Sequence, residues 1–192
     1  MIMSSHDFHV ELAEHDFSWA AMDTPVGPIA VTSNGQSIIR VEWPEPDEAT
    51  DDRTDQSDTG IHQGTGASDP LIAEALRQLR AYFDGALTTF DLPLDLGPVS
   101  ATARTVLTAL DETVEAGTTI TYGELARRSG TGIHARGIGS IMGMNPLPLV
   151  IACHRVVASD GLGGYSGGRR GTALGTKRWL LEFEDALPPA LF

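Results

Sequence analysis

Apolar and polar residues alternate in three short segments near the start of the chain, at Phe17–Met22, Ile29–Thr32 and Ile38–Trp43. A period of two is typical of strands that bury one face. The last two segments are separated by Asn34-Gly35, a dipeptide that favours a tight hairpin turn. We therefore expect this region to form a small antiparallel sheet.

Apolar residues then recur at the three-to-four-residue spacing of an amphipathic helix. One such helix is expected between Asp69-Pro70 and Gly85, and a second after Ser100. The segment between them, Phe90–Leu96, alternates like a strand or an extended connector. A terminal helix is expected over Lys177–Glu184.

Two shorter helices are predicted in the second half of the chain. The first opens at Thr121, and Glu124 follows three residues later, which is the spacing of a capping box. Gly130 closes it, and the next helix runs over about 133–144. A pair of short helices joined by a glycine-containing turn indicates a helix-turn-helix.

The predicted elements divide the chain into two units. Residues 44–69 are polar and acidic, and we interpret them as a long loop. A boundary near Gly97-Pro98 gives an N-terminal domain over 1–97 and a C-terminal domain over 98–187. The expected fold class is α+β: an N-terminal α/β domain with a small antiparallel sheet, then a mostly helical domain that contains the helix-turn-helix.

Composition narrows the class of protein. The 192 residues include one cysteine, which excludes an internal disulfide and any multi-cysteine zinc site, so we expect no metal. No secretory signal or membrane span is recognisable in the sequence, and we expect a cytoplasmic monomer without a membrane partner. The net charge is −13, but residues 116–181 hold eight basic and two acidic side chains. A locally basic segment leaves nucleic acid open as a partner.

The helix predicted over 133–144 has two unlike faces. Its core arc holds Ile138, Ile141 and Met142, whereas another arc holds small residues and Arg136. The small residues on or near that arc are Ala135, Gly137, Gly139, Ser140 and Gly143. Such a face suits either close helix packing within the protein or close approach to a nucleic acid, with Arg136 as the one long side chain.

An apolar segment, residues 145–152, leads to Cys153-His154-Arg155, and we expect it to be extended. A thiolate is a strong nucleophile, and a neighbouring imidazole or guanidinium favours it. Adjacent side chains of a strand point to opposite faces, so His154 serves Cys153 only if the chain bends or a water bridges them. The alternative is a small buried core cysteine.

A glycine-rich segment, Gly161–Gly168, follows the cysteine and holds Tyr165 and Ser166. It suits either a plain turn or a loop that closes over a planar ligand. In the terminal helix, Lys177, Leu180, Leu181 and Glu184 lie on one stripe. Glu184 is therefore expected to point inward, toward Cys153, and Glu182 to remain at the surface.

Together, five ordered motifs closely resemble the O6-alkylguanine-DNA alkyltransferases, also called methylated-DNA–protein-cysteine methyltransferases. They are Thr121-Tyr122-Gly123-Glu124-Leu125-Ala126, Asn145-Pro146, Cys153-His154-Arg155-Val156, Tyr165-Ser166-Gly167-Gly168 and Lys177–Glu184, with Arg136 between the first two. The resemblance is strong over about 100–185 and looser over about 17–99. It implies direct-reversal DNA repair, in which a cysteine takes the alkyl group from O6-alkylguanine, and from O4-alkylthymine, and is consumed.

The resemblance assigns catalytic roles to Cys153, His154, Glu184, Asn145 and Tyr122. Cys153 is the alkyl acceptor, and His154 acts as its base through a water, oriented by Glu184. Asn145 ties the turn together, and Tyr122 donates a proton to the leaving guanine. No cofactor is implied.

The resemblance also assigns the contacts with substrate and DNA. Tyr165 and Ser166 line the base pocket, and the Val156 carbonyl accepts from the guanine amino group. Double-stranded DNA binds through its minor groove to the small-residue helix, with Ala135, Gly137 and Gly139 on that helix. Arg136 enters the base stack while the damaged base is flipped out.

Three features depart from the family pattern. Ala152 replaces the usual proline before the cysteine, the signature around Ser100–Leu107 is altered, and the link over 169–176 is longer. A basic loop facing DNA is one interpretation of that link. Two other functions therefore stay open: a module that binds alkylguanine without efficient transfer, and a Cys/His hydrolase that turns over.

Overall fold

The computed structural model describes residues 17–44, 61–63, 69–169 and 171–187. Three strands form the predicted sheet: β1 (Ser18–Met22), β2 (Ile29–Ser33) and β3 (Ile38–Glu42). They pair antiparallel, with Trp19 opposite Thr32 and Val31 opposite Val41. The turn between β2 and β3 is closed by Asn34, whose side-chain oxygen accepts from the backbone N–H groups of residues 36 and 37.

A fourth strand corrects the interpretation of 44–69 as loop throughout. Residues Ile61–Gln63 form β4, which pairs antiparallel with β1 and gives the sheet order β3-β2-β1-β4. The segment has only three residues and no alternating pattern of its own, so its strand conformation depends on the exposed edge of β1. The rest of the predicted acidic loop, 45–60 and 64–68, lies outside the described residues.

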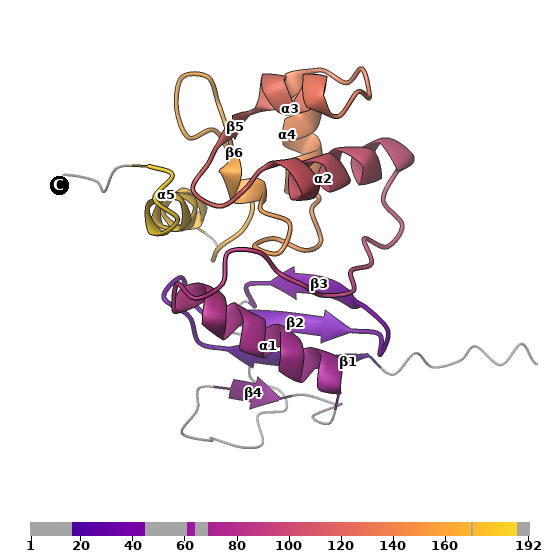
Figure 1. Cartoon of the computed structure of the whole chain (residues 1–192), viewed down its shortest axis with the longest axis vertical. Coiled ribbons are helices and arrows are strands. Elements are labelled where there is room, and N and C mark those ends of the chain that lie inside the picture. The colour runs from indigo at the N-terminus through magenta and orange to yellow at the C-terminus, as the bar shows by residue number, and fades with distance from the viewer. Residues whose placement is uncertain (1–16, 45–60, 64–68, 170, 188–192) are drawn as a thin grey trace, which may run out of the picture.

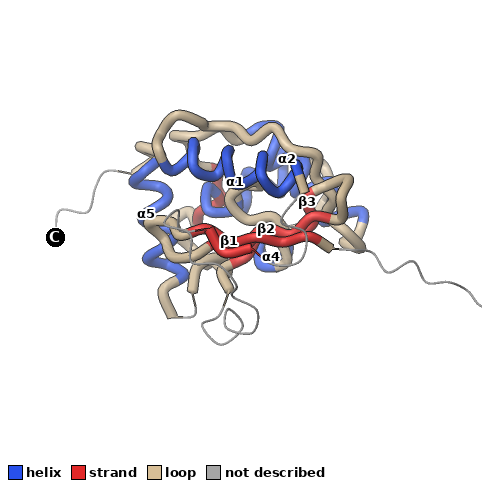
Figure 2. Tube along the Cα trace, turned by 90° about the horizontal axis from the view of Figure 1, so that it is seen from below, coloured by secondary structure: helices blue, strands red, loops and turns tan. Residues whose placement is uncertain are grey.

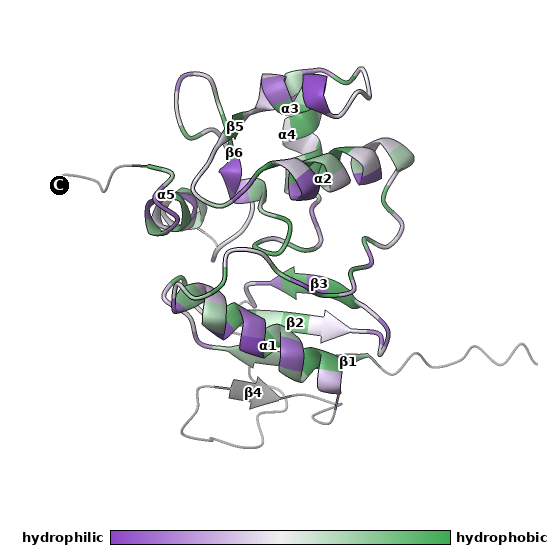
Figure 3. Ribbon diagram, viewed as in Figure 1, coloured by the Kyte–Doolittle hydropathy of each residue, from purple (hydrophilic) through white to green (hydrophobic). Residues whose placement is uncertain are grey.

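Helix α1 (Pro70–Phe83) covers one face of this sheet, as Figures 1 and 2 show. Asp69 caps it by accepting from the backbone N–H of Leu71, and Pro70 occupies the first turn, where no donor is needed. Hydrophobic and hydrophilic residues alternate around the helix (Figure 3). Its buried apolar side chains include Ile72, Leu76 and Leu79.

The second unit is mostly helical, as predicted. It begins with α2 (Ala101–Thr113), capped by Ser100, and continues with β5 (Ile120–Thr121). Residues 84–100, which include Gly97-Pro98, connect α1 to α2. Within this connector Leu94 bridges to Ile38 of β3, so the predicted extended segment lies along the sheet edge.

In the described residues, no helix is long and apolar enough to cross a membrane.

The helical pair expected after Thr121 is present as α3 (Tyr122–Arg128) and α4 (Ala135–Gly143). Thr121 and Glu124 form both hydrogen bonds of the capping box. Gly130 and Gly132 adopt positive φ angles of 65° and 71° in the connection, which favours glycine there. Ile138, Ile141 and Met142 are buried, so the predicted core arc of α4 is confirmed.

The segment before Cys153 is not extended, contrary to expectation. Residues 146–151 form successive turns, and Cys153–Arg155 forms a short 3₁₀ helix, η2. Pro146 and Pro148 have no backbone N–H group to donate to a neighbouring strand. Asn145 forms hydrogen bonds across the turn, so the apolar segment 145–152 folds back on itself. Strand β6 (Val156–Val157) follows and pairs parallel with β5.

The terminal helix α5 spans Ala173–Phe183 and so begins four residues before the predicted start. Half of the link 169–176 is thus helical, which shortens the loop proposed to face DNA.

The buried side chains of both units form one hydrophobic cluster that runs from Ala20 in β1 to Leu180 in α5. The shared core fixes the N-terminal unit against the elements that hold Cys153.

Candidate active site around Cys153

Asn145 holds the turn that delivers Cys153. Its side-chain amide donates to the carbonyl oxygen of Ile151 at 2.8 Å, and its side-chain oxygen accepts from the N–H of Leu147 at 3.0 Å. Between them Leu149 adopts a φ of 72°, a costly conformation for a branched side chain. The two hydrogen bonds of Asn145 stabilise this strained turn.

Cys153 adjoins a cavity of about 520 Å³, although the residue itself is only 3% exposed. The cavity lies between α3, α4 and the glycine-rich segment. Its lining residues are Tyr122, Ala135, Arg136, Gly139, Met142, Gly143, Cys153, Gly164, Tyr165 and Ser166. The structure thus brings together most of the residues that the sequence assigned to catalysis, substrate and DNA.

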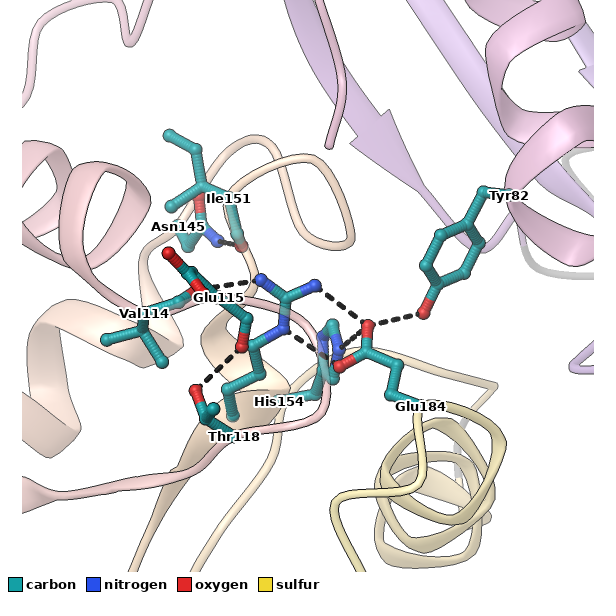
Figure 4. A network of polar contacts seen from close by, with 9 residues as sticks. Tyr82, Val114, Glu115, Thr118, Asn145, Ile151, His154 and Glu184 are labelled. Carbon is teal, nitrogen blue, oxygen red and sulfur yellow. Dashed lines mark hydrogen bonds and ion pairs between the residues drawn. The ribbon is translucent and has the colours of Figure 1, made fainter. Parts of the chain in front are cut away.

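His154 and Glu184 form the second part of the site (Figure 4). His154 Nε2 lies 3.0 Å from Glu184 Oε1, and both side chains are almost fully excluded from solvent, at 0% and 2% exposure. Glu184 follows the last turn of α5 and points inward, as its helical position predicted. Glu182 instead lies nearer the surface and pairs with Arg178.

Arg155 is a further partner of Glu184. Its Nε donates to Oε2 at 2.8 Å and its Nη2 to Oε1 at 2.9 Å, which is a two-pronged pair. Its Nη1 donates to the carbonyl oxygen of Val114. Glu184 therefore interacts with His154 and with Arg155 at the same time.

The hydrogen bonds fix the tautomer of His154. Burial raises the pKa of Glu184, but the hydrogen bonds from His154 and Arg155 outweigh burial and lower it to about 2. The carboxylate is therefore ionised and accepts, so the proton of neutral His154 resides on Nε2. Nδ1 then holds a free lone pair, and it is buried with no hydrogen-bond partner among the described residues.

Burial also keeps the nucleophile and its neighbour neutral at rest. It raises the pKa of the Cys153 thiol, against the opposing effects of the Asn145 hydrogen bond and the Lys177 charge. It lowers the pKa of His154, against the attraction of Glu184. Both groups are therefore neutral in the absence of substrate, and attack by the thiol would need a base to take its proton.

Lys177 links strand β6 to the glycine-rich segment 161–168 beside the cavity. The sequence did not predict this contact. Its ammonium group is fully buried and donates to the carbonyl oxygens of Val156 at 2.7 Å and Gly164 at 2.9 Å. Burial lowers its pKa to about 8. The Tyr122 hydroxyl also donates to Gly164, at 3.2 Å. Val156 is not one of the cavity-lining residues, and Lys177 already occupies its carbonyl.

The glycine-rich segment forms one wall of the cavity through Gly164, Tyr165 and Ser166. The Tyr165 ring packs edge-on against Trp43 of the N-terminal unit, with centroids 6.5 Å apart. A Cβ on Gly167 would lie 2.5 Å from the Tyr165 ring, and one on Gly163 would lie 2.8 Å from Tyr122. Glycine at these two positions lets both aromatic side chains line the cavity.

The small residues of α4 divide between two roles. Ala135, Arg136 and Gly139 line the cavity, and Arg136 is exposed at its rim. Gly137 does not line it: a Cβ there would lie 2.5 Å from the side chain of Ile133. The small size of Gly137 therefore serves packing against Ile133, and its contact with DNA stays a prediction.

Known proteins match both units. Residues 18–96 match the model of the 6-O-methylguanine DNA methyltransferase, ribonuclease-like domain, and residues 101–186 match the DNA binding domain of the same family. A methylated-DNA–protein-cysteine methyltransferase of Mycobacterium tuberculosis is 33% identical over 90% of this chain and 94% of its own length. The mouse protein of that name is 34% identical over 86% of this chain and 80% of its own length.

Solved structures agree with these matches. The M. tuberculosis O6-methylguanine methyltransferase superposes with a TM-score of 0.67 and 31% identity, covering 91% of this chain and 96% of its own. A structure described as M. tuberculosis OGT in complex with DNA has a TM-score of 0.67 and 34% identity, covering 86% and 91%.

Proposed function

This chain belongs to the 6-O-methylguanine DNA methyltransferase family, and we propose that it repairs DNA by transferring the alkyl group of O6-alkylguanine to Cys153. The observation that carries the proposal is the placement of Cys153 at the cavity, followed in the chain by His154, which is buried against Glu184. O4-alkylthymine is a second proposed substrate, because it offers the same alkylated exocyclic oxygen.

The proposed reaction is a displacement at the alkyl carbon. The Cys153 sulfur forms a bond to that carbon while the bond from carbon to guanine O6 breaks. His154 Nδ1 takes the thiol proton through a bridging water, which would also give that buried nitrogen its missing partner. The nearby carboxylate of Glu184 stabilises the imidazolium that results.

The leaving guanine needs a proton to become neutral. Tyr122 lines the cavity, and we assign its hydroxyl to donate that proton to the ring. Burial raises the pKa of Tyr122, so the hydroxyl remains protonated at neutral pH. The products are restored guanine and an S-alkyl cysteine, and the proton taken up by His154 returns to the Tyr122 phenolate through solvent. Because water does not readily break the carbon–sulfur bond of a thioether, we propose that each molecule reacts once.

The substrate base must leave the duplex to reach Cys153. We propose that α4 enters the minor groove, where its exposed Ala135 and the cavity-lining Gly139 allow the phosphate backbone to approach. Arg136 at the rim would fill the space left in the base stack. We propose that the protein acts as a monomer in the cytoplasm, where a free thiol stays reduced.

The proposal is tested by counting products. Purified protein is incubated with an excess of duplex containing O6-methylguanine, and restored guanine is measured per mole of protein, with Cys153→Ser as control. We expect a plateau near one equivalent for the wild type and no product for the variant. Product far above one equivalent favours a hydrolase, and binding without product favours a recognition module.

A further inference from the structure

The N-terminal unit makes a direct polar contact with the catalytic carboxylate. Tyr82 belongs to the last turn of α1, far from Cys153 in the sequence, and its hydroxyl donates to Glu184 Oε1 at 2.8 Å. Figure 4 shows this hydroxyl pointing at the carboxylate from the side opposite the helix α5 backbone. Tyr82 is almost fully buried, at 2% exposure.

Aromatic packing fixes the Tyr82 ring in place. Phe83, Phe90 and Phe183 surround it, with ring centroids between 5.1 and 5.6 Å for these three pairs. Such contacts leave the hydroxyl little freedom to move away from Glu184. Burial raises the pKa of Tyr82 and the charge of Glu184 raises it further, so the hydroxyl stays protonated and acts only as a donor to the carboxylate.

Tyr82 and His154 use the same carboxylate oxygen. Glu184 Oε1 accepts from Tyr82 at 2.8 Å, from His154 at 3.0 Å and from Arg155 at 2.9 Å. Each donor draws negative charge toward itself, so a third donor weakens the attraction of Oε1 for the other two. The strength with which Glu184 holds an imidazolium at His154 therefore depends on Tyr82.

We propose that Tyr82 is a positioning residue for alkyl transfer, through which the N-terminal unit aims the Glu184 carboxylate and limits how strongly it retains a proton on His154. This inference rests on the proposed function. The titratable and charged groups that act on His154 and Glu184 are Arg155, Lys177, Cys153, Tyr165 and Tyr82. Tyr82 and Tyr165 are the neutral hydroxyl groups of this set; Tyr82 donates to Glu184, whereas the buried Tyr165 hydroxyl has no hydrogen-bond partner in the described residues.

The test compares Tyr82→Phe with Phe90→Leu. The first variant keeps the ring and removes the donor, whereas the second disturbs the same aromatic cluster without touching Glu184. Single-turnover transfer from free O6-benzylguanine is measured between pH 5 and 9. Without the Tyr82 donor, Glu184 holds the His154 proton more tightly, so the acidic limb of the profile should move up by about one pH unit.

Phe90→Leu should leave that limb in place, even if it lowers thermal stability. If Tyr82→Phe reacts more slowly by the same factor at every pH, and the acidic limb of its pH profile stays in place, Tyr82 has a merely structural role. That result overturns the proposal. An unchanged profile at full rate overturns it as well.

A second measurement separates this inference from the proposed function. In ¹⁵N-histidine NMR spectra of the full chain, the pKa of the His154 imidazole should be higher in Tyr82→Phe than in the wild type or in Phe90→Leu. An identical titration of His154 in all three proteins, or its absence over the same pH range in all three, contradicts the role of Tyr82. If the wild type transfers no benzyl group, the proposed function fails, but the NMR comparison still decides what Tyr82 does.

Discussion

The ammonium group of Lys177 lies 2.7 Å from the carbonyl oxygen of Val156, the atom that the family resemblance assigns to the guanine amino group. A carbonyl oxygen has two lone pairs, so the Val156 carbonyl can accept from Lys177 and from a guanine amino group at the same time. The same ammonium group donates to the carbonyl oxygen of Gly164, which belongs to the glycine-rich segment 161–168. Lys177 therefore sets the separation of the two segments between which the base would bind.

Lys177→Met should slow alkyl transfer from free O6-benzylguanine by about tenfold or more, because the buried Val156 carbonyl and the Gly164 carbonyl lose a charged donor. Arg178→Met is the matched control: it removes the next side chain of α5, which is exposed and pairs only at the surface with Glu182. Single-turnover rates of both variants measure the effect. Equal rates for the two variants would show that Lys177 does not shape the site.

Glu184→Gln should slow transfer by about 10²-fold or more, the usual scale of a positioned acid–base element. The amide keeps the shape of the side chain but no longer stabilises a charged His154. Glu182→Gln, which alters a partly exposed carboxylate two residues away, should change the rate little. Stopped-flow or quench measurements on duplex substrate would give both rates, and the reverse ranking would refute the assignment of Glu184.

Glu184 should also contribute to acid stability. Its pKa is about 2 in the folded protein and near 4.5 in the unfolded chain, so its contribution is complete above about pH 4.5 and is lost as the pH falls through about 2. Between pH 5 and 2 the wild type should lose about 3 kcal/mol more free energy of unfolding than Glu184→Gln. Urea titrations at several pH values measure this difference, and parallel stability curves would argue against an ionised buried carboxylate.

Arg136→Ala should weaken repair of duplex DNA by about tenfold or more, and should change the reaction with free O6-benzylguanine by less than about twofold. The free base needs no flipping, so it does not need a residue that fills the stack. Arg104→Ala, which removes an exposed positive charge from α2, is the control for general electrostatic attraction. If Arg136→Ala slows both substrates equally, Arg136 acts on the chemistry or the fold rather than on the duplex.

Local signals predicted the elements whose conformation depends on nearby residues. The capping box of Thr121 forms, and helices begin after Asp69 and Ser100 as expected, since a cap needs only a side chain and an N–H group two or three residues away. The inward position of Glu184 followed from helical spacing alone. These features required no knowledge of the rest of the chain.

Features that depend on distant contacts could not be predicted. The strand Ile61–Gln63 exists because β1 offers an edge, and the turns over 146–151 depend on the side-chain bonds of Asn145. Tyr82 has no sequence signal for its role: its ring fits the apolar stripe of α1, and only the packing of α1 beside α5 brings its hydroxyl to Glu184. Lys177 likewise finds its two carbonyl partners only in the folded chain.

The mass of the protein after reaction tests the central claim most directly. The full chain is incubated with duplex DNA that contains one O6-methylguanine, and the intact protein and its proteolytic peptides are weighed. We predict a gain of one methyl group on nearly every molecule, confined to the peptide with Cys153, and no gain with unmethylated duplex. An unchanged mass while the guanine is restored, or a methyl group on any other residue, would contradict the account.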